Sequence, residues 1–197
     1  AAALQLGAPH RKVAFSVPTG NFGDVFAGYV AAQMGLPIER LIVATNVNDI
    51  LHRALSSGEY SAGSVTPTAA PSMDIQVSSN FERLLFDLNG RDGKALADQM
   101  AGFEATKAMH LTNAQRANLE DGGASALFTS ARADADDMAQ AIRWAWEACG
   151  ELIDPHTACA IHAARTSGVA REVPVVTLAT APPAKFPDAV ERATGQR

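Results

Sequence analysis

Two short apolar runs on either side of a helical pattern constrain the fold more than any other feature of the sequence. Lys12 to Val17 and Arg40 to Thr45 are typical of buried strands. Gly35, followed two residues later by Pro37, provides a helix stop between them. Apolar residues recur at helical spacing before that stop: Val25, Phe26, Tyr29, Val30 and Met34. The order strand, helix, strand predicts a right-handed βαβ unit with parallel strands.

Further elements continue the alternation. One more buried strand is expected over Val173 to Ala179. Helices are expected from a cap at Asn46 or Asn48 to about Ser56, over Asn80–Leu88, Asp92–Lys107 and Ala135–Cys149, from Asp154-Pro155 to about Gly168, and over Ala184–Thr194. The sequence therefore predicts an α/β fold with a parallel sheet flanked by helices.

Two segments give no clear periodicity. Ser57 to Pro71 is rich in Gly, Ser, Thr and Pro, and its length is typical of a functional loop, so a substrate-facing lid is expected there. Leu111 to Arg132 gives only a weak signal, with Asp121-Gly122-Gly123 as its clearest turn. No element is predicted in this second segment.

Composition limits the class of protein. With 197 residues, 47% hydrophobic and 19% charged, the chain is long enough for one globular domain or for part of a larger protein. A net charge of −5 argues against a nucleic-acid partner, and no apolar run approaches the roughly 18 residues of a membrane span. The spacing of Cys149 and Cys159 fits neither a zinc site nor a redox pair, which favours a cytoplasmic protein. The start, without a Met, suggests a piece of a longer chain.

The turn Pro18 to Asp24 lies where the first strand gives way to the helix. Free N–H groups and the positive end of the helix dipole favour a small anion there. Gly20 and Gly23 permit close approach, and Asn21 adds a donor amide and tolerates a left-handed backbone. The turn lacks the Lys-Ser/Thr pair of a P-loop and the third glycine of the dinucleotide fingerprint. An ordinary Gly-rich connection is the alternative interpretation.

The residues Ser16 to Asp24 resemble the phosphate loop of threonine synthases, which are pyridoxal-phosphate enzymes of the tryptophan-synthase-β fold type (fold type II). Five further blocks resemble the family in the family's order. They are 44–51 (Ala-Thr-Asn-Val-Asn-Asp-Ile-Leu), 71–75 (Pro-Ser-Met-Asp-Ile), 78–83 (Ser-Ser-Asn-Phe-Glu-Arg), 153–158 (Ile-Asp-Pro-His-Thr-Ala) and 180–187 (Thr-Ala-Pro-Pro-Ala-Lys-Phe-Pro).

The resemblance covers nearly all of the chain but only about the C-terminal half of a family member. It implies that residues 1–197 form a single partial domain, the C-terminal portion of the large domain, without the family's N-terminal segment and small domain. It also implies the residues that bind pyridoxal 5'-phosphate. Those that hold its phosphate are Gly20, Asn21, Phe22, Gly23 and Asp24, and Thr180 meets its pyridine nitrogen.

The resemblance also implies what is missing. In the family the imine-forming lysine stands in a Phe-Lys-Asp context before the phosphate loop, and none of Lys12, Lys94, Lys107 and Lys185 has that context. No catalytic residue is therefore expected in this chain, and Lys185 is assigned to the closing helix. The missing N-terminal half is the expected partner. Pro182 stands where the family usually has a His, which puts any role of that His in doubt.

The implied reaction is that of threonine synthase, in which O-phospho-L-homoserine and water give L-threonine and phosphate by γ-elimination and β-addition. One alternative is a catalytically silent protein that binds phosphate or pyridoxal phosphate, and another is a relative acting on a different phosphorylated amino acid. His156 and His162 lie on different faces of a predicted helix, which argues against a metal site. Ser72 and Asn80 are candidates for lining the pocket, with turn or capping roles as the alternative.

Overall fold

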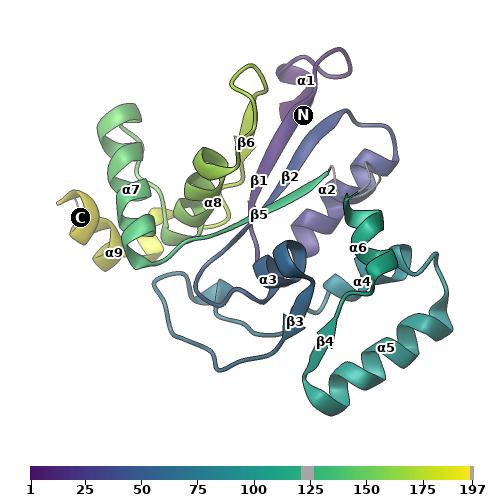
Figure 1. Cartoon of the computed structure of the whole chain (residues 1–197). Coiled ribbons are helices and arrows are strands. Elements are labelled where there is room, and N and C mark those ends of the chain that lie inside the picture. Colours follow the sequence, from purple (N-terminus) through teal and green to yellow (C-terminus); the bar gives the residue numbers. More distant parts are fainter. Residues whose placement is uncertain (121–126, 196–197) are drawn as a thin grey trace.

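Four parallel strands form the central sheet of the computed structural model, which describes residues 1–120 and 127–195. The strands are β1 (Val13–Pro18), β2 (Ile38–Thr45), β5 (Phe128–Arg132) and β6 (Val175–Thr177), in the spatial order β5-β2-β1-β6. In register, Ser16 of β1 lies beside Ile42 of β2 and Thr177 of β6. Figure 1 shows the arrangement of these strands. The predicted parallel βαβ unit, β1-α2-β2, is confirmed.

Helices cover both faces of this sheet. On one face, α2 (Gly23–Gln33) packs so closely on Leu41 that a Cβ on Gly28 would lie 2.8 Å from the Leu41 Cδ2 atom. On that same face lies α3 (Ile50–Ser57), whose His52 Nδ1 is 2.9 Å from Ser130 Oγ. On the other face lies α8 (Pro155–Thr166), whose Ala160 carbonyl accepts a 2.6 Å hydrogen bond from Ser16. The fold class is therefore as predicted.

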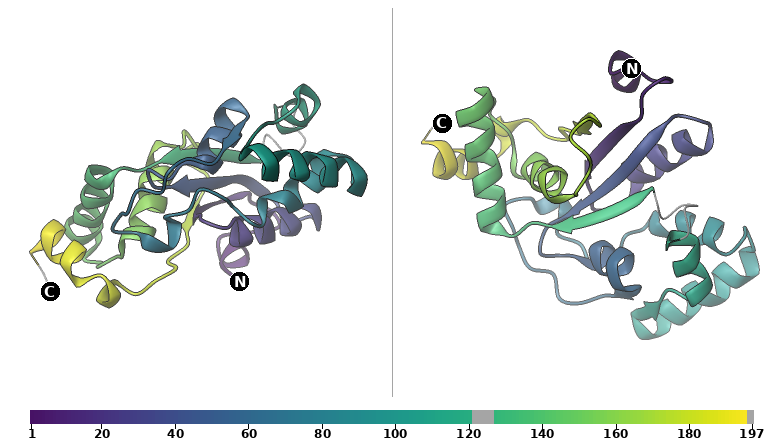
Figure 2. Two further views of the ribbon diagram at one scale, coloured as in Figure 1. Left: turned by 90° about the horizontal axis from the view of Figure 1, so that it is seen from below. Right: turned by 45° about the horizontal axis from the view of Figure 1, so that its top comes forward.

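Most of the remaining elements lie on two opposite sides of the central sheet. Beside α8 lies α7 (Ala135–Cys149), against which α9 (Pro187–Thr194) packs, whereas a short helix α1 (Ala2–Gln5) precedes β1. On the far side lie three helices and an antiparallel two-stranded sheet, as both figures show (Figures 1 and 2). They are α4 (Phe81–Leu88), α5 (Gly93–Thr106), α6 (Asn113–Glu120), β3 (Glu59–Ser61) and β4 (Ala108–His110).

Capping by aspartate sets the start of three predicted helices. Asp92, Asp134 and Asp154 are the N-cap residues of α5, α7 and α8; the first two side chains each accept hydrogen bonds from two backbone N–H groups of the first turn, and Asp154 accepts from one. These groups have no partner within the helix, so an acidic cap stabilises the start. The three helices therefore begin where the sequence predicts.

Other boundaries differ from the prediction. The last strand covers only Val175–Thr177 and is half-buried, because it lies at the edge of the sheet. The closing helix begins at Pro187, whose ring disfavours a helical conformation at the preceding residue. Lys185 therefore belongs to a separate 3-10 turn, Pro183–Lys185, and not to the helix.

Three more expectations need correction. The N-cap of α3 is Asp49, since Asn46 and Asn48 both donate to Asp74 instead. In α2, Val25 and Tyr29 are buried, but Val30 and the C-cap residue Met34 are exposed, so the apolar stripe is narrower than predicted. The segment without a prediction contains α6 and the edge strand β5, and the Asp121-Gly122-Gly123 turn lies outside the described residues.

The segment 57–71 is also more ordered than expected. It contains β3, and beyond that strand it is fastened to the end of β2 by side-chain hydrogen bonds. Asn48 exchanges two hydrogen bonds with the Thr66 backbone, and Asp74 accepts from both the N–H and the hydroxyl of Thr68. These contacts favour a fixed wall over a lid.

The two cysteines differ in reactivity, which gives a first testable prediction. Both are free thiols; Cys149 is exposed at the end of α7, whereas Cys159 is buried in α8. Burial raises the pKa of the Cys159 thiol to about 12, so little of the reactive thiolate exists near neutral pH. We expect a thiol reagent to titrate one group in the folded chain and two in denaturant. Two rapidly reacting thiols in the folded chain would contradict the packing of α8.

Candidate functional site

The Gly-rich turn lies at the carboxyl end of β1, next to the point where the strand order reverses. The chain passes from β1 outward through β2 to β5, and then returns to the other side of β1 with β6. In open α/β sheets, ligands bind outside the carboxyl ends of the strands at such a switch point. The fold therefore places this turn, the Gly20–Asp24 cradle, where a ligand site is expected.

A left-handed residue shapes the cradle. Phe22 is the N-cap of α2 with φ 65° and ψ 8°, whereas Gly20, Asn21 and Gly23 have no positive φ. Its ring is buried, and it packs edge-on against Phe81 and at a tilt against Phe128, with 5.4 Å and 6.0 Å between the ring centroids. These aromatic contacts offset the cost of a left-handed conformation at a bulky residue. The strained residue is thus Phe22 and not the expected Asn21.

The space at Gly20 is closed by a neighbouring segment. A Cβ on Gly20 would lie 2.8 Å from the Ser72 carbonyl oxygen, 3.6 Å from Ile75 Cδ1 and 3.7 Å from Met73 Cα. Real Cβ contacts do not come that close to a backbone oxygen, so glycine is required here for space. The contact explains the glycine through packing, since its backbone does not need a positive φ.

Two carbonyl groups of the cradle are held from the outside. Ser78 Oγ donates to the Gly20 carbonyl at 2.9 Å, and the Asn80 N–H donates to the Asn21 carbonyl at 3.1 Å. Tyr60 fixes Ser78 in turn, because its hydroxyl accepts from the Ser78 N–H at 2.8 Å. With the carbonyls drawn outward, the N–H groups at the start of α2 are left to face a ligand. Ser78 and Tyr60 were missed as site residues, although Ser78 lies in a resembling block.

A small cavity lies above the turn. Its volume is about 240 Å³, and it is lined by Val17, Pro18, Thr19, Gly20, Asn21, Phe22, Gly23, Asp24, Val25 and Asn80. Asn80 makes no capping hydrogen bond from its side chain, so it lines the cavity and does not serve as the expected cap. Asp24 is exposed to solvent, which screens its charge. All five predicted phosphate-binding residues thus come together around one cavity.

Thr180 stands at the same edge of the sheet. It follows β6, which is the parallel neighbour of β1, and the Leu178 N–H donates to the Ser16 carbonyl at 2.9 Å. Thr180 is exposed, and Pro182 beyond it takes an extended conformation with φ −75° and ψ 142°. The cradle and Thr180 therefore lie beyond the ends of two adjacent strands.

A buried carboxylate and imidazole lie at the start of α8. Asp154 accepts from the His156 N–H at 2.8 Å, from His156 Nδ1 at 2.7 Å and from the Thr157 hydroxyl. Burial alone raises the pKa of Asp154, but hydrogen bonds from His156 and Thr157 outweigh it and hold that pKa below its usual range. Asp154 is therefore a buried carboxylate that stays ionised.

The lysines lie outside the lining of the cavity above the cradle. Lys12, Lys94, Lys107 and Lys185 are all exposed, and none of them lines the cavity over the cradle. Over residues 1–120 and 127–195, no group of His, Cys, Asp and Glu side chains is arranged to hold a metal ion. In the same residues, no helix is long and apolar enough to cross a membrane.

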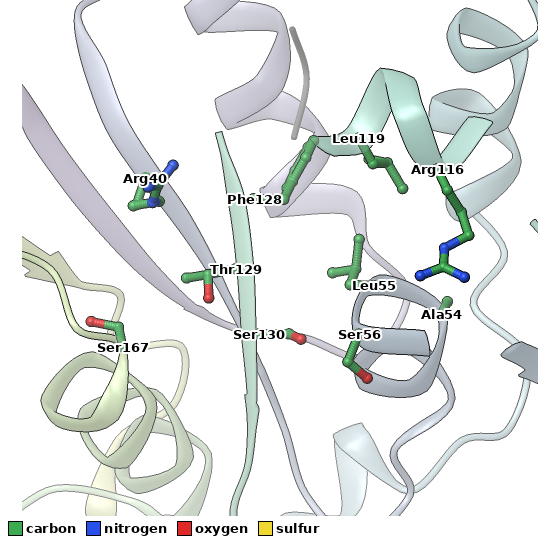
Figure 3. Close-up of a pocket in the computed structure, with 10 residues that line it drawn as sticks. All are labelled: Arg40, Ala54, Leu55, Ser56, Arg116, Leu119, Phe128, Thr129, Ser130 and Ser167. Carbon is green, nitrogen blue, oxygen red and sulfur yellow. The ribbon is translucent and has the colours of Figure 1, made fainter. Parts of the chain in front are cut away.

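A larger hollow of about 570 Å³ opens along the outer edge of β5. Arg40 and Ser167 lie on one side of this strand, and Ser56 and Arg116 on the other (Figure 3). The positions of the two sites can be compared along β2. The hollow reaches Phe128, which lies beside Leu41 of β2, whereas the cradle follows Pro18, which lies beside Ala44, nearer the carboxyl end of that strand. The two sites are therefore at different levels of the sheet, and no sequence pattern indicates the second one.

The chain is similar to threonine synthases in sequence and in fold. A family model described as "Threonine synthase, C-terminal" matches residues 157–197. Threonine synthase from Pseudomonas aeruginosa is 53% identical over 98% of this chain. The structure of threonine synthase from Brucella melitensis with bound pyridoxal phosphate superposes with a TM-score of 0.91 at 50% identity, over 98% of this chain. Over nearly its whole length, the chain is therefore similar to one portion of threonine synthases.

The match to the threonine synthases is partial in length. This chain spans 40% of the Pseudomonas protein and 40% of the Brucella structure. The structure of yeast threonine synthase superposes with a TM-score of 0.89 at 37% identity. That match covers 98% of this chain and 40% of the yeast chain. The chain therefore has the fold of one portion of threonine synthases, which are fold-type II enzymes.

Proposed function

We infer that this chain is the portion of a threonine synthase that holds the phosphate of pyridoxal 5'-phosphate. The observation that carries the proposal is the cradle itself: a cavity of about 240 Å³ lies at a helix start, and its wall leaves no room for a side chain at Gly20. A helix N-terminus with free N–H groups favours a phosphate. The partial match to threonine synthases supports the same assignment.

The residues present fit the phosphate of this cofactor. The backbone of Gly20, Asn21, Phe22, Gly23 and Asp24 would hold it, together with the first turn of α2. Thr180, at the end of the adjacent strand, would face the pyridine nitrogen. When bound, pyridoxal phosphate acts as an electron sink for reactions of amino acids. A neutral threonine hydroxyl, unlike a carboxylate, leaves the ring nitrogen largely unprotonated and moderates that action.

The chain's part in the reaction is to bind and orient. The four lysines are exposed and lie outside the cavity lining, so the covalent attachment and the base belong to the rest of the longer protein. The whole protein would convert O-phospho-L-homoserine and water to L-threonine and phosphate in the cytoplasm. A single partial large domain, residues 1–197, is thus proposed to act together with the missing N-terminal half. A silent phosphate-binding role is the alternative for the chain alone, because no lysine lines its cavity.

Binding of pyridoxal phosphate to this chain tests the proposal. We expect equilibrium dialysis to show binding of pyridoxal 5'-phosphate that inorganic phosphate displaces, and much weaker binding of pyridoxal, because the cradle recognises the phosphate. Borohydride is expected to fix no cofactor to a single lysine of this chain, but to do so in a longer protein that carries the N-terminal half. Equal binding of pyridoxal and its phosphate would overturn the assignment.

A further inference from the structure

His156 connects α8 to the wall of the cradle. The residue is 3% exposed, its Nδ1 lies 2.7 Å from Asp154 Oδ1, and its Nε2 accepts a hydrogen bond from the Ser72 N–H at 3.3 Å. Because a backbone N–H can only donate, Nε2 must be the unprotonated nitrogen and Nδ1 must carry the proton. Asp154 therefore selects the tautomer that offers a lone pair to Ser72.

Ser72 is the residue that limits the space at Gly20. It lies in the 3-10 turn Pro71–Met73, whose internal hydrogen bonds run from the Met73 N–H to the Ala70 carbonyl and from the Asp74 N–H to the Pro71 carbonyl. The Ser72 N–H is not used by either bond. His156 is therefore what ties this residue to the sheet-covering helix α8.

The other end of the same segment is fixed independently. Asp74 accepts hydrogen bonds from Asn46 Nδ2 at 2.6 Å, Asn48 Nδ2 at 3.0 Å and the Thr68 N–H at 2.7 Å. Asn46 directly follows β2, so this end moves with the sheet. Ser72 and its carbonyl lie between the two attachments, and only the attachment at His156 acts on Ser72 itself.

We propose that His156 is a positioning residue for the cradle. Its Nε2 holds the Ser72 backbone, and Ser72 in turn sets the position of Gly20 beneath the bound phosphate. A ligand-binding group needs such support, since displacements well below 1 Å weaken the hydrogen bonds that it makes. The inference rests on the proposed phosphate site, and it assigns a role to a buried histidine that lies outside the lining of the cavity.

Two substitutions distinguish the contributions of the two ring nitrogens of His156. His156→Gln keeps an acceptor at the place of Nε2 but loses the donor to Asp154, whereas His156→Asn keeps a donor at the place of Nδ1 but loses the acceptor for Ser72. We expect the Asn variant to bind inorganic phosphate and pyridoxal phosphate about tenfold more weakly, a change of about 1.4 kcal/mol, and the Gln variant to stay within about threefold of the original chain. Isothermal titration calorimetry measures both.

The reverse ranking, or equal losses in the two variants, would overturn the proposal, because a purely structural role depends on the bond to Asp154. Hydrogen exchange at the Ser72 amide is a second measurement: it should be fast in the Asn variant and slow in the Gln variant. If neither variant folds, nitrogen NMR of the unsubstituted chain decides, with a protonated Nε2 contradicting the proposal. Failure of the original chain to bind phosphate would instead count against the proposed function.

Discussion

Replacing Gly20 by aspartate is expected to weaken binding of pyridoxal phosphate by about 100-fold, or about 2.7 kcal/mol. Two effects add. A Cβ at this position would lie 2.8 Å from the Ser72 carbonyl oxygen, so either the turn or the wall must shift. A carboxylate next to the start of α2 would also repel a phosphate that the helix terminus otherwise favours. Isothermal titration calorimetry with the purified variant measures the loss.

Gly63→Asp is the matched control. Gly63 is an exposed loop glycine without a positive φ, and a Cβ there would meet only Gln76 at 3.9 Å, an ordinary contact. This substitution adds the same side chain and the same charge away from the cradle, so the affinity for pyridoxal phosphate should be unchanged. Circular dichroism should show nearly the same helix content in both variants. If Gly20→Asp and Gly63→Asp bind equally well, the phosphate is held elsewhere.

Asp154→Ala is expected to lower the free energy of unfolding by about 3 kcal/mol, the largest stability effect predicted here. The carboxylate is fully buried, and it accepts from His156 N, His156 Nδ1 and the Thr157 hydroxyl. Alanine leaves these buried donors without their acceptor and also removes the N-cap of α8. Urea unfolding followed by circular dichroism measures the change.

Asp134→Ala isolates the part that comes from burial. Asp134 is likewise an N-cap aspartate, of α7, and accepts from the Asp136 and Asp137 N–H groups, but it is exposed. Loss of an exposed cap costs about 1 kcal/mol. Equal destabilisation by the two substitutions would mean that the buried cluster with His156 contributes nothing beyond capping.

Much of the fold could be predicted because local signals agreed with the tertiary structure. The strands β1 and β2 are apolar runs, and α7 combines an Asp cap with an apolar face that is buried at Met138 and Ile142. Where each local preference points to the same structure, sequence patterns succeed. The two adjoining parallel strands then fix the edge on which the site must lie.

Two elements that were not predicted are β5, which lacks such a local signal, and α6, which has one. β5 is polar at Thr129, Ser130 and Arg132, because it is an edge strand that needs no continuous apolar run. For α6, Thr112 and Gln115 form a capping box, in which each side chain accepts from the other's N–H at 3.2 and 2.9 Å. The Thr-x-x-Gln spacing is a start signal that could have been recognised.

The support of the site could not be predicted from spacing alone. The Gly20–Asp24 turn can be recognised in the sequence as a strand-to-helix connection with two glycines. Ser72, Ser78 and His156, however, reach it from segments that are 52 to 136 residues away in the sequence, and they act through backbone contacts. Backbone contacts leave little trace in side-chain patterns. Only the structure shows that a histidine in α8 accepts a hydrogen bond from the wall behind Gly20.

A crystal structure of this chain grown with pyridoxal 5'-phosphate would test the central claim most directly. We predict the phosphate within hydrogen-bonding distance of the N–H groups of Gly20 to Asp24, above the start of α2. The hollow along β5 is the alternative anion site, because Arg40 and Arg116 line it from opposite sides of the strand (Figure 3). Phosphate in that hollow, with the cradle filled by solvent, would contradict the account.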